Sequence, residues 1–246
     1  MNATDPAEAG LSIILPVFNE APTISGVIER VMQSASDHHW DWELLIVNDG
    51  STDATPACLR PFSRHPRVRI FDHERNRGKG AAIRTALAAA NRDLTVVQDA
   101  DFEYDPSEIA VLVEAASRKQ VDVVYGSRIL GAASGIAESR RNVYSVGVWV
   151  LNVVVRLLYG RRLTDEATCY KLFRTSDLRR MELECLGFEF CPEVTAKAFR
   201  LGLSLAEVPI SYHPRSLRDG KKIRFRDAIV AIRTLWRFRR WSPKNA

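Results

Sequence analysis

A short apolar run followed at once by three carboxylates constrains this chain more than any other feature. Residues Leu94–Val97 are apolar and β-branched enough to form one buried strand of a parallel sheet. Asp99, Asp101 and Glu103 follow on alternate positions, so in extended backbone their side chains share one face. Carboxylates that close repel each other unless a cation lies among them or one of them is protonated. The pattern indicates a site for Mg²⁺ or Mn²⁺, or else an acidic turn before a helix that starts at Asp105–Pro106.

Strand and helix patterns alternate on both sides of this run. The alternation predicts an α/β fold with a mostly parallel central sheet and helices on both faces. We expect the strands at residues 12–16, 43–47, 68–71, 94–97, 121–125 and 205–210, with a further site-facing strand within 164–174. The expected helices cover residues 22–34, 81–90, 106–119, 140–159, 191–201 and 225–241, and residues 131–139 are expected to form a mobile loop.

Chemically active side chains follow the predicted strands. Open α/β sheets bind their ligands at the carboxyl ends of the strands, so this placement favours a real site over scattered structural residues. The Gly78–Gly80 segment opens a predicted helix, and its backbone N–H groups and Lys79 suit a diphosphate or, alternatively, lie in solvent. It lacks the full P-loop spacing, and no GxGxxG follows the first strand. The residues just past a strand end are Pro16, Glu20, Asp49, Lys79, Asp99, Asp101 and Arg128.

Charge is distributed unevenly along the 246 residues, whose formal net charge is +5. From Ser211 onward eleven Lys or Arg stand against two Asp, so the rest of the chain is mildly acidic. A basic end points to an anionic partner, which could be nucleic acid, a membrane surface or a phosphate ligand. We expect a disordered segment at 1–10, one large domain at 11–222 and a basic amphipathic helix at 223–246. The four cysteines show no metal-type spacing, which is typical of reduced thiols in the cytosol.

Two helical segments leave a membrane interpretation open. Residues 140–159 are strongly apolar but include Asn152 and Arg156, which favours a core helix or one lying in the membrane interface over a spanning helix. In the last helix Phe225, Ile229, Ile232, Leu235 and Trp236 are expected on one side, and Arg226, Arg233, Arg237 and Arg240 on another. That basic face fits either an anionic membrane surface or solvent.

Six motifs in order resemble the family 2 glycosyltransferases of the GT-A fold. Within that family the chain looks most similar to the dolichyl-phosphate mannose synthase and polyprenyl-phosphate glycosyltransferase branch. The resemblance covers roughly residues 11–222 and implies a GT-A domain. The motifs are Pro16–Glu20, Val47–Asp53, Gly78–Gly80, Asp99–Asp101, Tyr125–Arg128 and Val208–Ile210 with the basic loop that follows it.

The resemblance also implies roles for individual residues. The nucleotide's base and ribose would contact Pro16, Phe18, Glu20, Val47 and Asp49, while Asp99, Ala100, Asp101 and Glu103 would surround the metal and the diphosphate. The phosphate-contacting positions would be Arg128, Arg215 and Lys222, and the lipid phosphate would meet Arg140 or Arg141 and Ser145. Two positions depart from the family pattern. Glu103 stands where the family often has Gln, and Cys169–Lys171 replaces its Gly-Phe-Arg.

These roles imply a metal-dependent, inverting transfer of a hexose from a GDP-mannose or UDP-glucose type donor to a polyprenyl or dolichyl phosphate. An ionised phosphate acceptor needs no general base, whereas a hydroxyl acceptor would need one, with Asp165 or Glu166 as candidates. A non-catalytic nucleotide-sugar-binding subunit is a remote alternative, and nucleic acid is not expected as a partner. We expect a cytoplasmic protein, peripheral on an anionic membrane surface, alone, as a homo-oligomer or with a membrane partner subunit.

Overall fold

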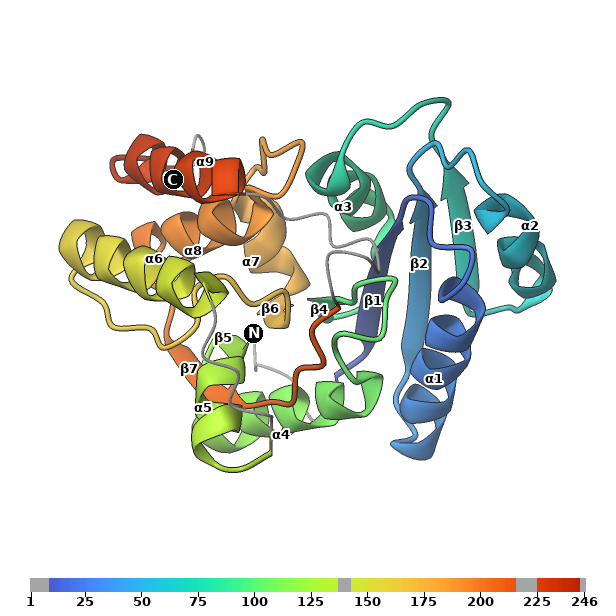
Figure 1. Cartoon of the computed structure of the whole chain (residues 1–246). Coiled ribbons are helices and arrows are strands. Elements are labelled where there is room, and N and C mark those ends of the chain that lie inside the picture. Colours follow the sequence, from blue (N-terminus) through green and yellow to red (C-terminus); the bar gives the residue numbers. More distant parts are fainter. Residues whose placement is uncertain (1–8, 137–142, 216–224, 244–246) are drawn as a thin grey trace.

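The sheet that organises the molecule runs through its centre (Figure 1). The computed structural model describes residues 9–136, 143–215 and 225–243. In these ranges the sheet has seven strands in the order β3-β2-β1-β4-β6-β5-β7. Only β6 runs antiparallel to its neighbours, so the predicted mostly parallel α/β fold is confirmed. The strands are β1 (Leu11–Val17), β2 (Trp42–Asn48), β3 (Val68–Asp72), β4 (Leu94–Val97), β5 (Val123–Ser127), β6 (Lys171–Arg174) and β7 (Leu205–Pro209).

Helices cover both faces of the sheet because the central strands are apolar on both sides. Every residue of β1, β2 and β4 is buried, as expected for strands between two helical layers. The helices are α1 (Ile24–Asp37), α2 (Thr55–Leu59), α3 (Lys79–Ala89), α4 (Ile109–Lys119), α5 (Arg128–Ala133), α6 (Val143–Tyr159), α7 (Thr175–Arg180), α8 (Phe190–Arg200) and α9 (Phe225–Phe238), with 3₁₀ turns at Arg60–Arg64 and Pro106–Glu108.

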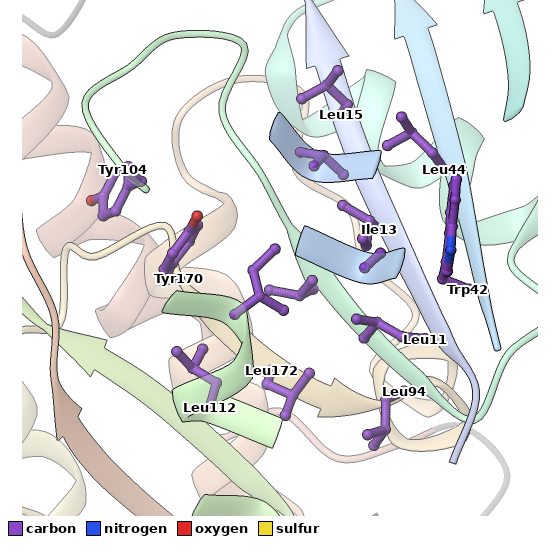
Figure 2. Close-up of a cluster of buried hydrophobic side chains, with 14 of the residues drawn as sticks. Leu11, Ile13, Leu15, Trp42, Leu44, Leu94, Tyr104, Leu112, Tyr170 and Leu172 are labelled. Atoms are coloured by element: carbon purple, nitrogen blue, oxygen red, sulfur yellow. The ribbon is translucent and has the colours of Figure 1, made fainter. Parts of the chain in front are cut away.

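The alternation of side chains along β1 divides the core into two layers. Leu11, Ile13 and Leu15 point to the layer that contains α1 and α4, and Figure 2 shows this cluster with Trp42 and Leu172. Ile14, which lies between Ile13 and Leu15, faces the opposite layer, and α3, α6, α7, α8 and α9 complete that layer. This sandwich holds the carboxyl ends of the parallel strands in one place.

Two predicted loop and strand boundaries were wrong. The segment 164–174 forms a strand only at Lys171–Arg174, and residues 164–170 are a loop that lies over the strand ends. Gly131 lies in α5 rather than in a mobile loop, and a Cβ there would come within 1.9 Å of the Ile210 carbonyl oxygen. The Ser127 side chain caps this short helix by accepting a hydrogen bond from Leu130 N. At the start of the chain, Ala9 and Gly10 are buried.

Helices α6 and α9 pack against each other (Figure 1). The Tyr159 hydroxyl on α6 donates to the Leu235 carbonyl on α9 at 2.6 Å. Of the apolar side chains expected on one side of α9, Leu235 is buried, whereas Ile229 and Trp236 are 42% and 55% exposed. Within the described ranges, no helix combines the length and the apolar character needed to cross a bilayer.

Candidate active site at the strand ends

Carboxylates from two neighbouring strand ends meet at the carboxyl edge of the sheet. Glu20 follows β1, and Asp99, Asp101 and Glu103 follow β4, which pairs in parallel with β1. Asp101, Glu103 and Glu20 are each less than 10% exposed. We call these four side chains the carboxylate cluster. The prediction that extended backbone brings Asp99, Asp101 and Glu103 to one face was wrong, because β4 ends at Val97 and residues 100–104 form bends.

A single arginine from the far end of the domain joins three members of the cluster. Arg215 Nη1 and Nη2 donate to the two Glu20 carboxylate oxygens at 3.1 and 3.2 Å, and Nη2 also donates to Asp101 Oδ2. The Arg215 backbone N–H donates to Glu103 Oε1 at 2.8 Å, and the Tyr212 hydroxyl donates to Glu103 Oε2 at 2.9 Å. The segment after β7 is therefore anchored directly on the cluster.

The fourth carboxylate has its own cation. Lys79 Nζ, at the start of α3, donates to Asp99 Oδ1 and lies 3.2 Å from Cys169 Sγ. Burial alone would raise the pKa of Asp99, but the Lys79 ammonium lowers it below its usual range. Asp99 and Lys79 thus face each other as a charged pair within the site.

Asp101 is the member of the carboxylate cluster whose pKa is raised. Burial and the neighbouring charges of Asp99 and Glu103 together raise its pKa to about 6, although Arg215 opposes them. Among the described side chains the cluster has four carboxylates and only two directly bonded cations, Lys79 and Arg215. This excess of negative charge favours a further cation.

The backbone N–H groups at the start of α3 already have partners within the protein. The Gly80 and Ala81 N–H groups donate to the Gly187 and Leu186 carbonyls at 3.0 and 3.1 Å, and the Gly78 N–H donates to Asp49 Oδ2 at 2.7 Å. The prediction that these backbone groups are open to a diphosphate was wrong, because a loop more than 100 residues away bonds two of them. Only the Lys79 side chain turns toward the cluster.

Asp49 organises the turn that precedes α3. Its carboxylate accepts from the Arg77 and Gly78 N–H groups at 2.9 and 2.7 Å, and its Oδ1 lies 2.6 Å from His73 Nδ1. No sequence signal marks His73, whose Nε2 lies 2.9 Å from Thr85 Oγ1. The side chains of Pro16 and Val47 are buried and Phe18 is half-buried, so a nucleotide contact by any of these residues stays a prediction.

Arg128 is held rigidly beside the site by Asp165. Arg128 Nε and Nη2 each donate to one Asp165 oxygen at 2.7 Å, and the Arg128 guanidinium lies 5.0 Å from the centre of the Tyr212 ring. Burial would lower the pKa of Arg128, but the Asp165 carboxylate raises it well above its usual range. Next to it, burial raises the pKa of Glu166, which is fully buried. Neither Glu166 oxygen has a hydrogen-bond partner among the described residues.

The donor atoms of the cluster suit a hard divalent cation, which prefers carboxylate oxygens. Asp101 fits best, because it is a buried carboxylate with a raised pKa. All three carboxylates after β4 already have protein partners, and the described part of the chain contains no preassembled group of three or more His, Cys, Asp or Glu side chains able to hold a metal. Ala100 is buried between the two aspartates, and its carbonyl accepts from Thr23 Oγ1 at 2.8 Å.

Four of the predicted phosphate-contacting residues cannot be placed. Arg140, Arg141 and Lys222 lie outside the described residues. Ser145 lies in α6, but its side chain is also outside the described part. Their roles stay predictions.

Solved structures of known proteins share this architecture. Glucosyl-3-phosphoglycerate synthase from Mycobacterium tuberculosis, crystallised with Mn²⁺, uridine diphosphate and phosphoglyceric acid, matches with a TM-score of 0.70 and 21% identity. The match covers 98% of this chain and 82% of the solved one. The same protein crystallised with uridine diphosphate alone matches with a TM-score of 0.69, 20% identity and coverage of 96% and 81%. These likenesses identify the fold as GT-A.

Curated relatives point to one branch of that fold. Dodecaprenyl-phosphate galacturonate synthase of Rhizobium johnstonii is 27% identical over 86% of this chain, which spans 61% of that protein. Dolichyl-phosphate beta-glucosyltransferase ALG5A of Trichomonas vaginalis is 27% identical over 92% of this chain and 71% of its own length. Undecaprenyl-phosphate mannosyltransferase of Micrococcus luteus is 27% identical over 85% of both chains. The expected similarity to the polyprenyl-phosphate branch is confirmed.

The family model named Glycosyl transferase family 2 matches residues 12–181, a stretch that begins in β1 and ends just after α7. It contains Glu20, Lys79, the carboxylates after β4 and the Arg128–Asp165 pair. On the match, the fold and the site together, this chain belongs to glycosyl transferase family 2.

Proposed function

We propose that this protein transfers a hexose from a nucleoside-diphosphate sugar, of the GDP-mannose or UDP-glucose type, to a polyprenyl or dolichyl phosphate, with inversion and with a divalent metal. The observation that carries the proposal is the carboxylate cluster with Lys79 and Arg215 directly bonded to it. Its position at the carboxyl ends of parallel strands is where an open α/β sheet binds a nucleotide. The names of the curated relatives support the class of acceptor.

The charges of the site suit a departing diphosphate. When a sugar C1 leaves a nucleoside diphosphate, negative charge grows on the leaving group, and fixed cations nearby stabilise that charge. Lys79, Arg128 and Arg215 supply such cations, and Arg128 is fixed by its two hydrogen bonds to Asp165. Mg²⁺ or Mn²⁺ bound at the cluster would add charge stabilisation as a Lewis acid.

The surroundings of Asp165 and Glu166 favour an acceptor that is already ionised. A hydroxyl acceptor needs a base that reaches its proton. Both Asp165 and Glu166 are fully buried, and the two Asp165 oxygens are occupied by Arg128. A lipid phosphate needs correct positioning but no proton removal. The hydroxyl-acceptor alternative therefore has weaker support from the described geometry.

Exposed side chains on α6 and α9 support action at the cytosolic membrane face. Val146, Trp149 and Leu157 on α6 are 61%, 65% and 78% exposed. Just after α9, Arg239 stacks on the exposed Trp236 with 3.7 Å between the guanidinium carbon and the ring centre. Apolar and aromatic side chains next to cations are typical of helices that bind an anionic lipid surface. Attachment is then peripheral, directly or through a partner subunit.

The proposal can be tested by following a labelled sugar into lipid. The protein is incubated with a panel of radiolabelled sugar nucleotides, polyprenyl phosphate and Mn²⁺, and the mixture is extracted with organic solvent. We expect label in the organic phase with one donor, and none in excess chelator. Label that stays in the aqueous phase with every donor contradicts the lipid acceptor, and slow metal-dependent hydrolysis of a donor would nearly exclude a non-catalytic binding subunit.

A single variant then separates the two acceptor classes. Glu166→Gln removes the carboxylate that is not paired with Arg128, so we expect turnover with the lipid phosphate to remain within about three-fold of wild type, because no base is required. A loss of more than about a hundred-fold with intact donor binding would instead support a hydroxyl acceptor.

A further inference from the structure

The two arginines of the site are bound in different ways. Arg128 forms a closed pair with one carboxylate, and both its Nε and its Nη2 are hydrogen-bonded to Asp165. Arg215 divides its two Nη groups between Glu20 and Asp101, and its buried Nε has no hydrogen-bond partner among the described residues. A guanidinium in a bidentate pair with one carboxylate holds that anion firmly. A guanidinium that keeps an unbonded N–H group can still bind another anion. Arg128 is therefore fixed, and Arg215 can exchange partners.

Arg215 also stands where a bound cation would compete with it. Asp101 Oδ1 accepts from the Glu103 N–H at 3.0 Å, which leaves Oδ2 as its other oxygen, and Arg215 donates to Oδ2. The same arginine bonds both oxygens of Glu20 and, through its backbone, one oxygen of Glu103. A guanidinium and a divalent cation cannot both be the main counter-ion of one buried carboxylate, because their charges repel at short distance.

We propose that Arg215 is a resident counter-ion that a divalent cation displaces from Asp101, and that the donor's diphosphate takes up the released guanidinium. The inference rests on the proposed function, because it assigns an order of events to the proposed metal and donor. In the free protein Arg215 offsets part of the negative charge of the cluster and blocks part of the cation site. Once the diphosphate binds Arg215, the Asp101 oxygen is left for the metal.

This exchange makes the metal and the donor help each other to bind. A cation that binds alone must first break the contacts of Arg215 with Asp101, so its apparent affinity is reduced by the fraction of molecules in which Arg215 is bound. The donor removes that cost, and by linkage the metal raises the affinity for the donor by the same factor. The cooperativity therefore exceeds what direct contact between the metal and the diphosphate supplies.

The first test measures Mn²⁺ binding without nucleotide, by EPR of the free ion, in wild type and in Arg215→Met. We expect Arg215→Met to bind Mn²⁺ about ten-fold more tightly, within the usual range for coupled sites. Arg30→Met is the matched control. This variant also removes one positive charge near the site, but Arg30 stacks on Phe102 rather than on the cluster. Equal or weaker Mn²⁺ binding by Arg215→Met, or an equal gain in Arg30→Met, would overturn the proposal.

A second test uses the unaltered protein, so it does not depend on the variant folding. Phenylglyoxal modifies free guanidinium groups, and mass spectrometry locates the modified arginine. We expect Arg215 to be protected without metal, to react several-fold faster with Mg²⁺ alone, and to be protected again when Mg²⁺ is present with UDP or GDP. Modification of Arg215 at one rate in all three conditions would overturn the exchange.

The two tests also distinguish failure of this inference from failure of the proposed function. If wild type binds no Mn²⁺ even with UDP or GDP present, the proposed metal requirement fails, and the inference fails with it. If Mn²⁺ binds with nucleotide but Arg215→Met leaves the nucleotide-free affinity unchanged, only the role of Arg215 as a displaced counter-ion is overturned.

Discussion

Two buried groups of charges in this molecule contrast sharply. The carboxylate cluster (Glu20, Asp99, Asp101 and Glu103) lies at the strand ends, and a pair formed by Glu193 and Lys197 lies within α8. In that pair both side chains are fully buried, with 2.5 Å between Lys197 Nζ and Glu193 Oε1. The Glu184 and Cys185 N–H groups each donate to Glu193 at 2.7 Å, and Lys197 also donates to the Glu182 carbonyl.

The difference is one of charge balance. The buried pair has one charge of each sign, and hydrogen bonds satisfy its polar atoms, so nothing further is needed to stabilise it. Among the described residues the carboxylate cluster has more anions than bonded cations, and the pKa of Asp101 is raised to about 6. An unbalanced group of like charges costs stability that a ligand of opposite charge can restore, whereas a balanced pair has no such need. The contrast favours the strand ends over α8 as the proposed ligand site.

The largest effect is expected from breaking the balanced pair. Lys197→Met leaves the Glu193 carboxylate buried with only two backbone donors, so we expect the free energy of unfolding to fall by about 3–5 kcal/mol in chemical denaturation. Activity per folded molecule should be unchanged, because α8 contributes no group to the cluster.

The double variant Lys197→Met with Glu193→Gln is the control for this prediction. It removes both charges, so it should be less destabilised than Lys197→Met alone. A single variant that keeps its stability but loses turnover would show that α8 belongs to the site, and the comparison between the two groups would fail.

The next effect is on catalysis and comes from the unbalanced cluster. Asp101→Asn preserves shape but removes one charge, so we expect turnover to fall by about 10²–10³-fold while the protein remains folded, because the cation that would stabilise the leaving diphosphate loses a charged ligand. The measurement is the initial rate of sugar transfer at saturating metal. Turnover close to that of wild type would mean that the excess charge at the strand ends has no role in the reaction.

A third effect is the pH dependence of stability. The folded-state pKa of Asp101 is about 6 and the ordinary value is 3.8, so the folded protein holds this proton more tightly than the unfolded chain does. Stability from this group is present at low pH and is lost as the pH rises from about 4 to above 6, by up to about 3 kcal/mol. Wild type should therefore lose stability relative to Asp101→Asn over that range, measured by denaturation at fixed salt. A difference that does not vary with pH would contradict the raised pKa.

Local sequence patterns predict where the carboxylates of the cluster lie better than they predict what contacts them. The place of Asp99, Asp101 and Glu103 just after a short buried strand follows from local sequence, whereas the bends at residues 100–104 do not follow from their alternate spacing. The Arg215–Asp101 contact joins positions 114 residues apart, and no periodicity encodes it. The resemblance suggested a phosphate contact for Arg215, but it did not indicate that this arginine would bond the metal-site carboxylates in the free protein.

Long-range packing explains the other failures. The N–H groups at the start of α3 are bonded by the 186–187 loop, so a local rule about helix starts could not show that they are occupied. The spacing of Glu193 and Lys197 is typical of an exposed helical ion pair, and only the packing of α9 over α8 buries it, with Lys197 Nζ lying 4.3 Å from the centre of the Phe238 ring. Leu235 is buried while Ile229 and Trp236 are exposed, because a helical wheel does not tell which sector of an apolar side meets a neighbour.

The smallest effect should come from a third kind of charge contact, at the surface. Arg237 and Glu184 are 67% and 46% exposed and form an ion pair of 2.5 Å. Solvent screens such a pair, so Arg237→Met should change the free energy of unfolding by less than about 1 kcal/mol, and about 1 M salt should abolish the difference. Glu184 Oε1 also lies 3.9 Å from Lys197 Nζ, so this pair adjoins the buried one. A loss above about 2 kcal/mol on denaturation would show that the balanced group extends to the surface through Glu184, because an isolated exposed pair cannot contribute that much.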